Sequence, residues 1–248
     1  MNDNPQNNLR RLDALEDKAV ELLDRNKLGA AASVLLEMLE SDKNSLPAHF
    51  HLARVYRRLG RFRKAVYHAR QTLRLSRYER NANLNLALIY DDTGNVKLAV
   101  QSYKRELQIN SNSPETNWNL GRLYFRNHQW KRASVCLKKC YDMGFDYCLE
   151  DTVDKLAVCY KKRGEIQSYI RLFEDYIRVS PEAAWAYVNL GRALLRAGDY
   201  NGAVLKLSRA GKLGAENKVR EDLERAKRCR KDSQQVVEHF DANRPLRR

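Results

Sequence analysis

The sequence has few residues that interrupt helices, and it contains no long hydrophobic run. Only 11 glycines and 5 prolines occur among 248 residues, and this scarcity favours a chain that is helical almost throughout. No stretch approaches the roughly 20 apolar residues that a membrane span needs, and the first residues hold no apolar core of signal-peptide length. We therefore expect a soluble protein without a membrane span that stays in the cytoplasm.

Cysteines are few, and their number is odd. The five cysteines show no short disulfide-style spacing, which indicates reduced thiols in a reducing compartment. Cys136 and Cys140 lie four residues apart and would share one face of a helix. No second Cys or His pair with zinc-site spacing accompanies them, so we interpret them as buried structural thiols rather than metal or redox groups.

Catalytic motifs are also missing. The sequence has no Gly-rich phosphate loop, no His-Glu-x-x-His motif, and no supported arrangement of Ser, His and Asp. These absences predict a protein that is not an enzyme and that uses neither a metal nor a cofactor.

Acidic residues are absent from one stretch of the sequence. Between Lys43 and Tyr78 there are ten Lys or Arg and not one Asp or Glu, and the whole chain carries a formal charge of +15. Such a charge predicts attraction to something acidic, which could be nucleic acid or an acidic peptide, although the bases could also serve solubility alone. The choice depends on where each base points in the fold.

A period of 34 residues organises the chain. Five leucines recur at intervals of 34, 34, 36 and 34, namely Leu52, Leu86, Leu120, Leu156 and Leu190. A small residue follows each leucine, a tyrosine comes three residues later in most repeats, and a glycine marks a turn near the middle. Apolar spacing within each unit is helical, so each unit is predicted to be a hairpin of two helices, a first and a second helix.

This period and pattern resemble the tetratricopeptide repeat, whose signature is present here in weakened form over residues 12 to 215. The resemblance implies an all-α, right-handed solenoid of about six helix hairpins and a C-terminal capping helix. The expected parts are a flexible N-terminus at 1–11, a degenerate first hairpin at 12–45, repeats at 46–79, 80–113, 114–149, 150–183 and 184–216, a capping helix at 217–240 and a flexible tail at 241–248.

Two local features complete this fold prediction. His128 stands where other repeats have glycine, so we expect that turn to avoid a positive φ angle. After the last repeat, Val219, Leu223 and Ala226 begin an apolar stripe that continues to Val236 and Phe240. Such a helix would cover the apolar end of the stack.

In the tetratricopeptide repeat family the first helix of each hairpin lines a concave groove, which usually holds an extended peptide. By this resemblance, exposed positions around the recurring leucines face the groove, and here they are mostly basic or aromatic, with an acidic step at Asp91 and Asp92. The predicted partner-binding residues are Phe50, Arg54, Arg57, Asn85, Trp118, Asn119, Arg122, Phe125, Arg126, Lys161, Asn189, Arg192 and Arg196.

Three of these residues form a separate series. Asn85, Asn119 and Asn189 each lie directly before a recurring leucine. A side-chain amide can donate to a peptide C=O and accept from its N–H, so a ladder of Asn could hold an extended chain without reading its sequence. This resembles the Asn ladders of tetratricopeptide superhelices, although Asn is also common at this position of the repeat.

Two functions from different classes remain open. The first is a scaffold or adaptor whose basic, aromatic groove binds an extended, acidic segment of a partner protein. The second is an RNA-binding or other nucleic-acid-binding solenoid that uses the bases between Lys43 and Tyr78 and the C-terminal "KRCRK" as phosphate contacts. Self-association through the ends of the solenoid is a third, purely structural role.

Overall fold

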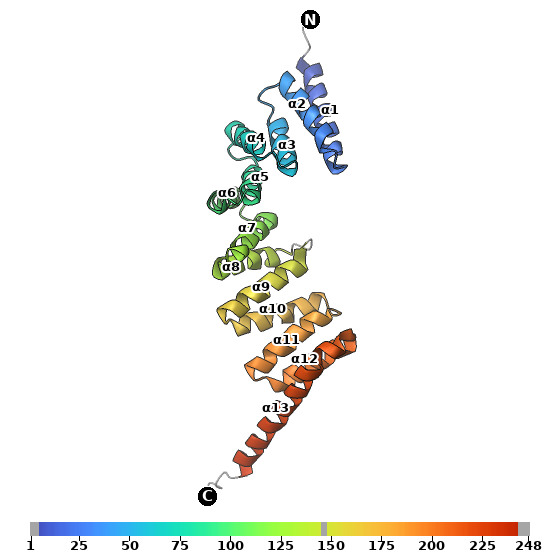
Figure 1. Cartoon of the computed structure of the whole chain (residues 1–248), viewed down its shortest axis with the longest axis vertical. Helices are drawn as coiled ribbons and strands as arrows, with labels where there is room; N and C mark the ends of the chain where they lie inside the picture. The colour runs from blue at the N-terminus through green and yellow to red at the C-terminus, as the bar shows by residue number, and fades with distance from the viewer. Residues whose placement is uncertain (1–4, 145–147, 243–248) are drawn as a thin grey trace. The chain divides into compact units, whose positions relative to one another are not determined.

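The computed structural model describes residues 5–144 and 148–242, with side chains described for residues 9–144 and 148–235. These residues form helices joined by short turns, without a strand among them (Figure 1). The helices are α1 (Pro5–Asp24), α2 (Leu28–Ser41), α3 (Leu46–Arg58), α4 (Phe62–Leu75), α5 (Ala82–Asp92), α6 (Val96–Ile109), α7 (Pro114–Arg126), α8 (Trp130–Asp142), α9 (Leu149–Arg163), α10 (Ile166–Val179), α11 (Ala184–Ala197), α12 (Tyr200–Ala210) and α13 (Glu216–Ala242). The prediction of an all-α solenoid is confirmed, while its right-handed sense stays a prediction.

The first and last helices, α1 and α13, extend past the bounds predicted for the parts they belong to. Helix α1 begins at Pro5, inside the segment 1–11 that was predicted to be a flexible N-terminus. Helix α13 covers the expected capping segment and reaches Ala242. Residues 1–4, 145–147 and 243–248 lie outside the described residues.

The turns between the two helices of a hairpin use left-handed backbone conformations. Gly60 and Gly94 have φ angles of 68° and 74°, where glycine carries no steric penalty. His128 has a φ of 56°, so the expectation that it avoids a positive φ was wrong. The short turn requires this conformation whichever residue occupies it, and His is among the residues that adopt it more readily than most.

Several first helices begin at a serine cap. Ser45 and Ser113 each accept a hydrogen bond from the backbone N–H three residues on, and a proline follows within the first turn. Helix α5 lacks this signal, because Asn81 at its N-cap has a φ of 64° and makes no side-chain cap. Glu106 of α6 replaces the missing cap: its fully buried carboxylate accepts hydrogen bonds from the N–H groups of Asn81 (2.9 Å) and Leu84 (3.2 Å).

The chain forms two compact units that divide between Asn127 and His128, and each is described by itself. In unit 1, consecutive helices from α1 to α7 pack in pairs around an apolar core. The recurring leucines Leu52 and Leu86 lie in this core, as do the small residues Ala53 and Ala87 that follow them. The small side chains allow the neighbouring helix to approach closely, as the repeat pattern predicts.

Unit 2 contains α8 to α13. Gly191 illustrates its packing, because a Cβ atom there would lie 2.6 Å from Cγ of Leu207 on α12. Only glycine therefore permits this contact between α11 and α12 without a shift of Leu207. Helix α13 packs against α12 through the buried side chains of Val219 and Ala226.

Two buried histidines join α3 to α4 in unit 1. Nδ1 of His49 lies 2.9 Å from Nδ1 of His68, and Nε2 of His49 lies 3.2 Å from the carbonyl oxygen of Lys43. A carbonyl only accepts, so Nε2 of His49 carries the proton, and His68 must donate from its own Nδ1. In this arrangement Nδ1 of His49 must be unprotonated, so His49 is neutral, and protonation of both rings would set two donors against each other.

We expect this pair to make unit 1 sensitive to acid. Burial is the main cause that lowers the pKa of His68 from 6.5 to about 4, with added repulsion from His49 and Lys64, and burial also lowers the pKa of His49. The unfolded chain therefore binds more protons than the folded chain between pH 6.5 and 4, so stability falls as pH falls through this window. The full contribution of His68 is about 3 kcal/mol.

The effect is measured by denaturant unfolding of the full chain at pH 7.0, 5.5 and 4.5, which are about the pH values that span this window. His68→Asn keeps an N–H donor near the Nδ1 position but cannot take up a proton, so its stability should depend less on pH than that of the wild type. Equal pH dependence in the two proteins would contradict the assignment.

Candidate functional site

In unit 1 the predicted binding residues lie on the first helices α3, α5 and α7. The guanidinium of Arg122 lies over the ring of Trp118, with 4.3 Å between its carbon and the ring centroid. Arg54 is exposed on α3, and Phe50 lies edge-on to His51 at 5.4 Å between ring centroids. Arg122 and Trp118 thus form a half-buried cation–π pair, which offers a flat apolar surface beside a positive charge.

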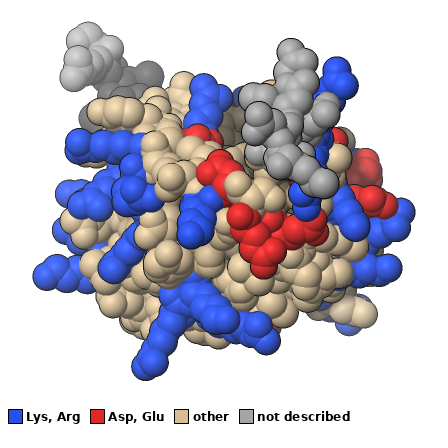
Figure 2. All heavy atoms as spheres, turned by 90° about the horizontal axis from the view of Figure 1, so that it is seen from above, with Lys and Arg blue, Asp and Glu red and all other residues tan. Residues whose placement is uncertain are grey.

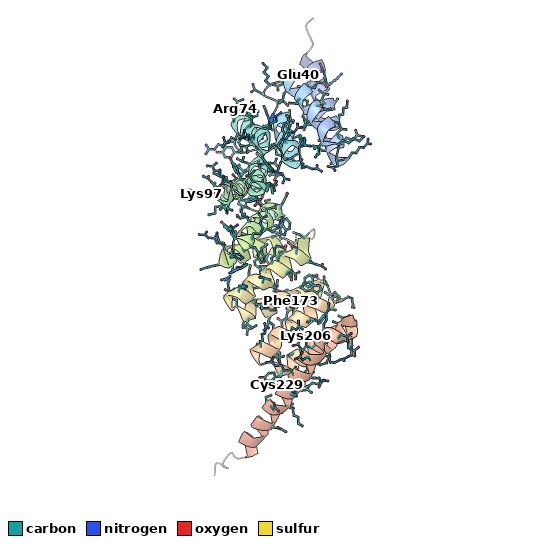
Figure 3. The ribbon with its side chains drawn as sticks, in the orientation of Figure 1. Glu40, Arg74, Lys97, Phe173, Lys206 and Cys229 are labelled. Carbon is teal, nitrogen blue, oxygen red and sulfur yellow. The ribbon has the colours of Figure 1, made fainter. Side chains whose placement is uncertain are left out.

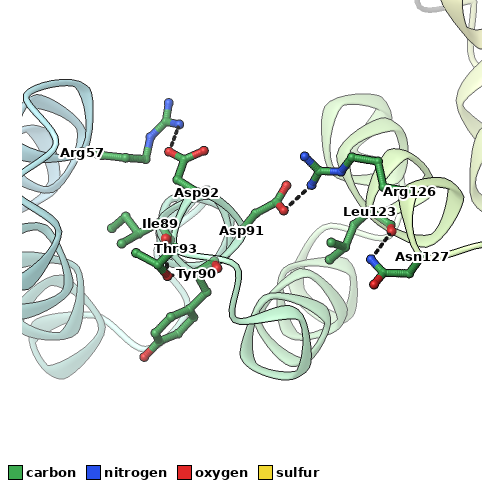
Figure 4. A network of polar contacts seen from close by, with 9 residues as sticks. All are labelled: Arg57, Ile89, Tyr90, Asp91, Asp92, Thr93, Leu123, Arg126 and Asn127. Carbon is green, nitrogen blue, oxygen red and sulfur yellow. Dashed lines mark hydrogen bonds and ion pairs between the residues drawn. The ribbon is translucent and has the colours of Figure 1, made fainter.

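The two aspartates of the predicted groove form ion pairs with two of its arginines. Nη1 of Arg57 on α3 donates to Oδ2 of Asp92 at 2.9 Å, and Arg126 on α7 forms an ion pair with Asp91 (Figure 4). These two aspartates of α5 therefore link the helices on either side of it. Arg57 and Arg126 contribute less free charge to a partner than their sequence positions suggest, because each already has a carboxylate of its own chain.

Two of the three asparagine side chains form hydrogen bonds within their own helices. Nδ2 of Asn119 donates to the carbonyl oxygen of Glu115 at 2.9 Å, and Nδ2 of Asn189 donates to that of Trp185 at 3.0 Å. Asn85 and Asn119 are almost fully buried. In Asn119 and Asn189 the donor that a ladder would offer to a peptide C=O is therefore already used inside the helix.

Unit 2 brings its four predicted residues together. Lys161 of α9 and Asn189, Arg192 and Arg196 of α11 line one cavity of about 230 Å³. The other lining residues are Tyr160, Gly164, Ile166, Tyr169 and Ala193. We call this the unit 2 pocket: its rim is basic and its walls are aromatic and aliphatic.

Hydrogen bonds and charges within the unit 2 pocket fix its shape. The hydroxyl of Tyr169 donates to Oδ1 of Asn189 at 3.2 Å, so both ends of the Asn189 amide are held. Burial raises the pKa of Tyr169, and the nearby Arg196 and Arg192 oppose that rise. The phenol therefore stays neutral at neutral pH and acts as a hydrogen-bond donor.

One base of the pocket has a partner from the C-terminal helix. Nε of Arg192 donates to Oδ2 of Asp222 on α13 at 2.6 Å, and its Nη2 donates to the carbonyl oxygen of Lys218 at 3.2 Å. Lys161 and Arg196 form no ion pair with a carboxylate of the described residues. They are the two cations that the pocket can offer to an anionic ligand.

The cysteines give no sign of a reactive site. Cys140 is buried, and burial is the main cause that raises its pKa to about 12, so its thiol is protonated at neutral pH. Cys136 is half-buried and belongs to the same helix, α8. Among the described residues no group of three or more His, Cys, Asp and Glu could hold a metal ion.

Some pocket residues were not identified from the sequence. Tyr160 entered only as one of the recurring tyrosines of the repeat, and Tyr169 of α10 was not singled out at all. The carboxylate partners of Arg57 and Arg126 could have been found, because each lies 35 residues from its arginine, close to one repeat period. Asp222 carries no comparable signal, since it lies in a helix outside the repeats.

In the part of the chain that the structure describes, no helix has both the length and the apolar composition needed to cross a bilayer. Both units instead consist of short helices that pack pairwise with their neighbours in sequence (Figure 1). This arrangement, with candidate binding residues along the first helices, defines a helical-repeat protein.

A family model described as the tetratricopeptide repeat matches residues 16–79, 50–114 and 161–217. The chain belongs to the tetratricopeptide repeat family. The resemblance inferred from the recurring leucines and glycines is thereby confirmed. No curated protein matches the chain.

Solved structures share the fold at low sequence identity. PilF of Pseudomonas aeruginosa is 18% identical with a TM-score of 0.62, covering 83% of this chain and 93% of PilF. A tetratricopeptide repeat protein of Parabacteroides merdae is 18% identical with a TM-score of 0.57, covering 91% of this chain and 93% of its own. YrrB, described as having an unusual peptide-binding site, is 16% identical with a TM-score of 0.58, covering 81% of this chain and 99% of YrrB.

Proposed function

We propose that this protein is a non-enzymatic interaction scaffold that binds an extended, acidic segment of a partner protein. The observation that carries the proposal is the convergence of Lys161, Arg192 and Arg196 in the unit 2 pocket beside Tyr160 and Tyr169. The odd number of cysteines and their lack of disulfide-style spacing support a reducing, cytoplasmic setting for this interaction.

The chemistry of the unit 2 pocket suits a carboxylate on an extended chain. Lys161 and Arg196 can pair with an Asp or Glu side chain, while the tyrosine rings cover the apolar part of that side chain. The amide of Asn189 is held in place by Tyr169 and Trp185, so little side-chain entropy would be lost there on binding.

Unit 1 offers a different kind of contact. The stacked pair of Trp118 and Arg122 provides an apolar anchor with one positive charge, and Phe50 and Phe125 extend the aromatic character of the first helices. Arg57 and Arg126 serve in this proposal mainly to hold α3, α5 and α7 in register through Asp92 and Asp91.

The test compares two double variants of the full chain. Lys161→Ala with Arg196→Ala removes the two uncommitted cations of the unit 2 pocket, whereas Arg171→Ala with Arg178→Ala removes the same charge from the second helix α10. Losing a desolvated charge pair costs about 2 kcal/mol or more, so the pocket variant should bind at least roughly 30-fold more weakly.

Binding is measured by isothermal titration to a short peptide that alternates Glu with Leu, and to the same peptide with Gln in place of Glu. Protein partners captured from nuclease-treated extract are then tested with the same variants. Tight binding of the Glu peptide that only the pocket variant loses supports the proposal. Equal binding of the Glu and Gln peptides, or equal loss in the two variants, would refute it.

A further inference from the structure

A second surface, in unit 1, carries most of the uncommitted positive charge of that unit. It consists of the second helices α4 and α6 with the segment that follows α4, and we call it the α4–α6 face. Nine bases on it are exposed, namely Arg63, Lys64, Arg70, Arg74, Arg77, Arg80, Lys97, Lys104 and Arg105. Figure 3 shows Arg74 of α4 and Lys97 of α6 on the same side of the unit.

The charge on the α4–α6 face is not balanced within the chain. Residues 62–81 and helix α6 contain only two carboxylates: Glu79 is half-buried, and Glu106 is buried and engaged with backbone N–H groups. None of the nine bases forms an ion pair with a carboxylate of the described residues. On the first helices of unit 1, by contrast, two of the arginines, Arg57 and Arg126, have carboxylate partners.

In the view of Figure 2, from above, Lys and Arg cover more of the visible surface than Asp and Glu. Nucleic acid carries condensed counterions, and these are released when exposed Lys and Arg without carboxylate partners pair with its phosphates. Nucleic acid bound to the α4–α6 face would therefore gain binding free energy from counterion release. The gain would be smaller on the first helices.

A hollow at the end of the α4–α6 face adds an aromatic platform. It has a volume of about 590 Å³ and is lined by Leu73, Arg77, Tyr78, Asn83, Arg105, Gln108 and Ile109. Tyr78 has 73% of its surface exposed, so its ring is accessible to a ligand. Arg77, Arg105 and Gln108 line the same hollow.

We propose that the α4–α6 face binds single-stranded nucleic acid, with a base stacked on Tyr78 in this hollow and the phosphodiester backbone following the nine bases. An aromatic ring within a basic surface is the combination that holds unpaired nucleotides. The exposed amide of Gln108 can donate to and accept from base edges. An acidic protein segment would use the charge but would gain little from an exposed ring among bases.

The experiment measures binding of the full chain to oligouridylate by fluorescence anisotropy at several salt concentrations. Arg77→Gln with Arg105→Gln should reduce the slope of log affinity against log salt by about 1.4, since each phosphate contact on a single strand contributes about 0.7. Tyr78→Ala should weaken binding about tenfold with the salt slope unchanged, and Tyr78→Phe should restore it.

The matched control is Lys162→Gln with Arg171→Gln, which removes two exposed bases from unit 2. It should leave both affinity and slope near wild type. No measurable binding of oligouridylate, or equal loss in the control, would overturn the proposal. Binding of a polyglutamate peptide in preference to oligouridylate, with no effect of Tyr78→Ala, would also overturn it and identify the face as a protein-binding surface.

Different variants test this inference and the proposed function, so either can be refuted without the other. The unit 2 pocket variants Lys161→Ala and Arg196→Ala should not change oligouridylate binding, and Tyr78→Ala should not change binding of the Glu peptide. Unchanged melting temperatures for all variants will show that the surface substitutions leave the fold intact.

Discussion

Replacing Glu106 by alanine is expected to lower the free energy of unfolding of unit 1 by about 3 kcal/mol. The carboxylate of Glu106 accepts hydrogen bonds from the backbone N–H groups of Asn81 and Leu84, and the side chain is fully buried. Alanine would leave the N–H groups of Asn81 and Leu84 without this acceptor, of which that of Leu84 is buried, and it would leave a cavity between α5 and α6.

Glu106→Gln keeps one acceptor oxygen but turns an NH2 group toward the second amide, so it should also destabilise the protein. Glu40→Ala is the control, because Glu40 is an exposed carboxylate on α2 and its loss should change stability by no more than about 0.5 kcal/mol. Unfolding in denaturant, followed by circular dichroism, measures all three variants. A Glu106→Ala midpoint equal to that of Glu40→Ala would contradict the capping role.

Ending the chain after Ala215 is expected to destabilise unit 2 and to promote aggregation. This truncation removes α13, whose Val219 and Ala226 are buried and whose Leu223 is half-buried. Losing these contacts costs roughly 5 kcal/mol, counting the apolar surface of α12 that becomes exposed. Exposed apolar ends of repeat stacks associate, which is why terminal repeats carry a polar cap.

A second truncation, after Asp232, provides the control. It removes the end of α13 but keeps Val219, Leu223 and Ala226, so its melting temperature should equal that of the full chain. Thermal melting and light scattering after size exclusion compare the two truncations. If the shorter chain does not aggregate and has the same melting temperature as the longer one, α13 is not a cap.

The repeat pattern was sufficient to predict the helices and much of the core. The leucines at intervals near 34 and the small residues after them are governed by local helical spacing and close helix packing, and Leu52, Leu86, Ala53 and Ala87 are buried as that pattern requires. Serine followed by proline likewise indicates where α3 and α7 begin, because the cap depends on residues within one turn.

The candidate sites were predicted less completely. Helical periodicity placed Lys161, Asn189, Arg192 and Arg196 on first helices, and the structure brings them into one pocket. The sequence pattern did not show which of the bases on the first helices have a carboxylate partner within the chain. Two of those arginines in unit 1 are neutralised by Asp91 and Asp92, whereas the bases on α4 and α6 have no carboxylate partner among the described residues.

By itself, therefore, the sequence determined the family, the helix hairpins and the apolar columns, since each depends on spacing within a repeat. Only the tertiary structure decided which charges are free and which polar groups are satisfied. Glu106 caps a helix that begins 24 residues earlier, and Asp222 reaches Arg192 from outside the repeats. Such pairings depend on distances between side chains on different helices, and the packing of those helices sets these distances.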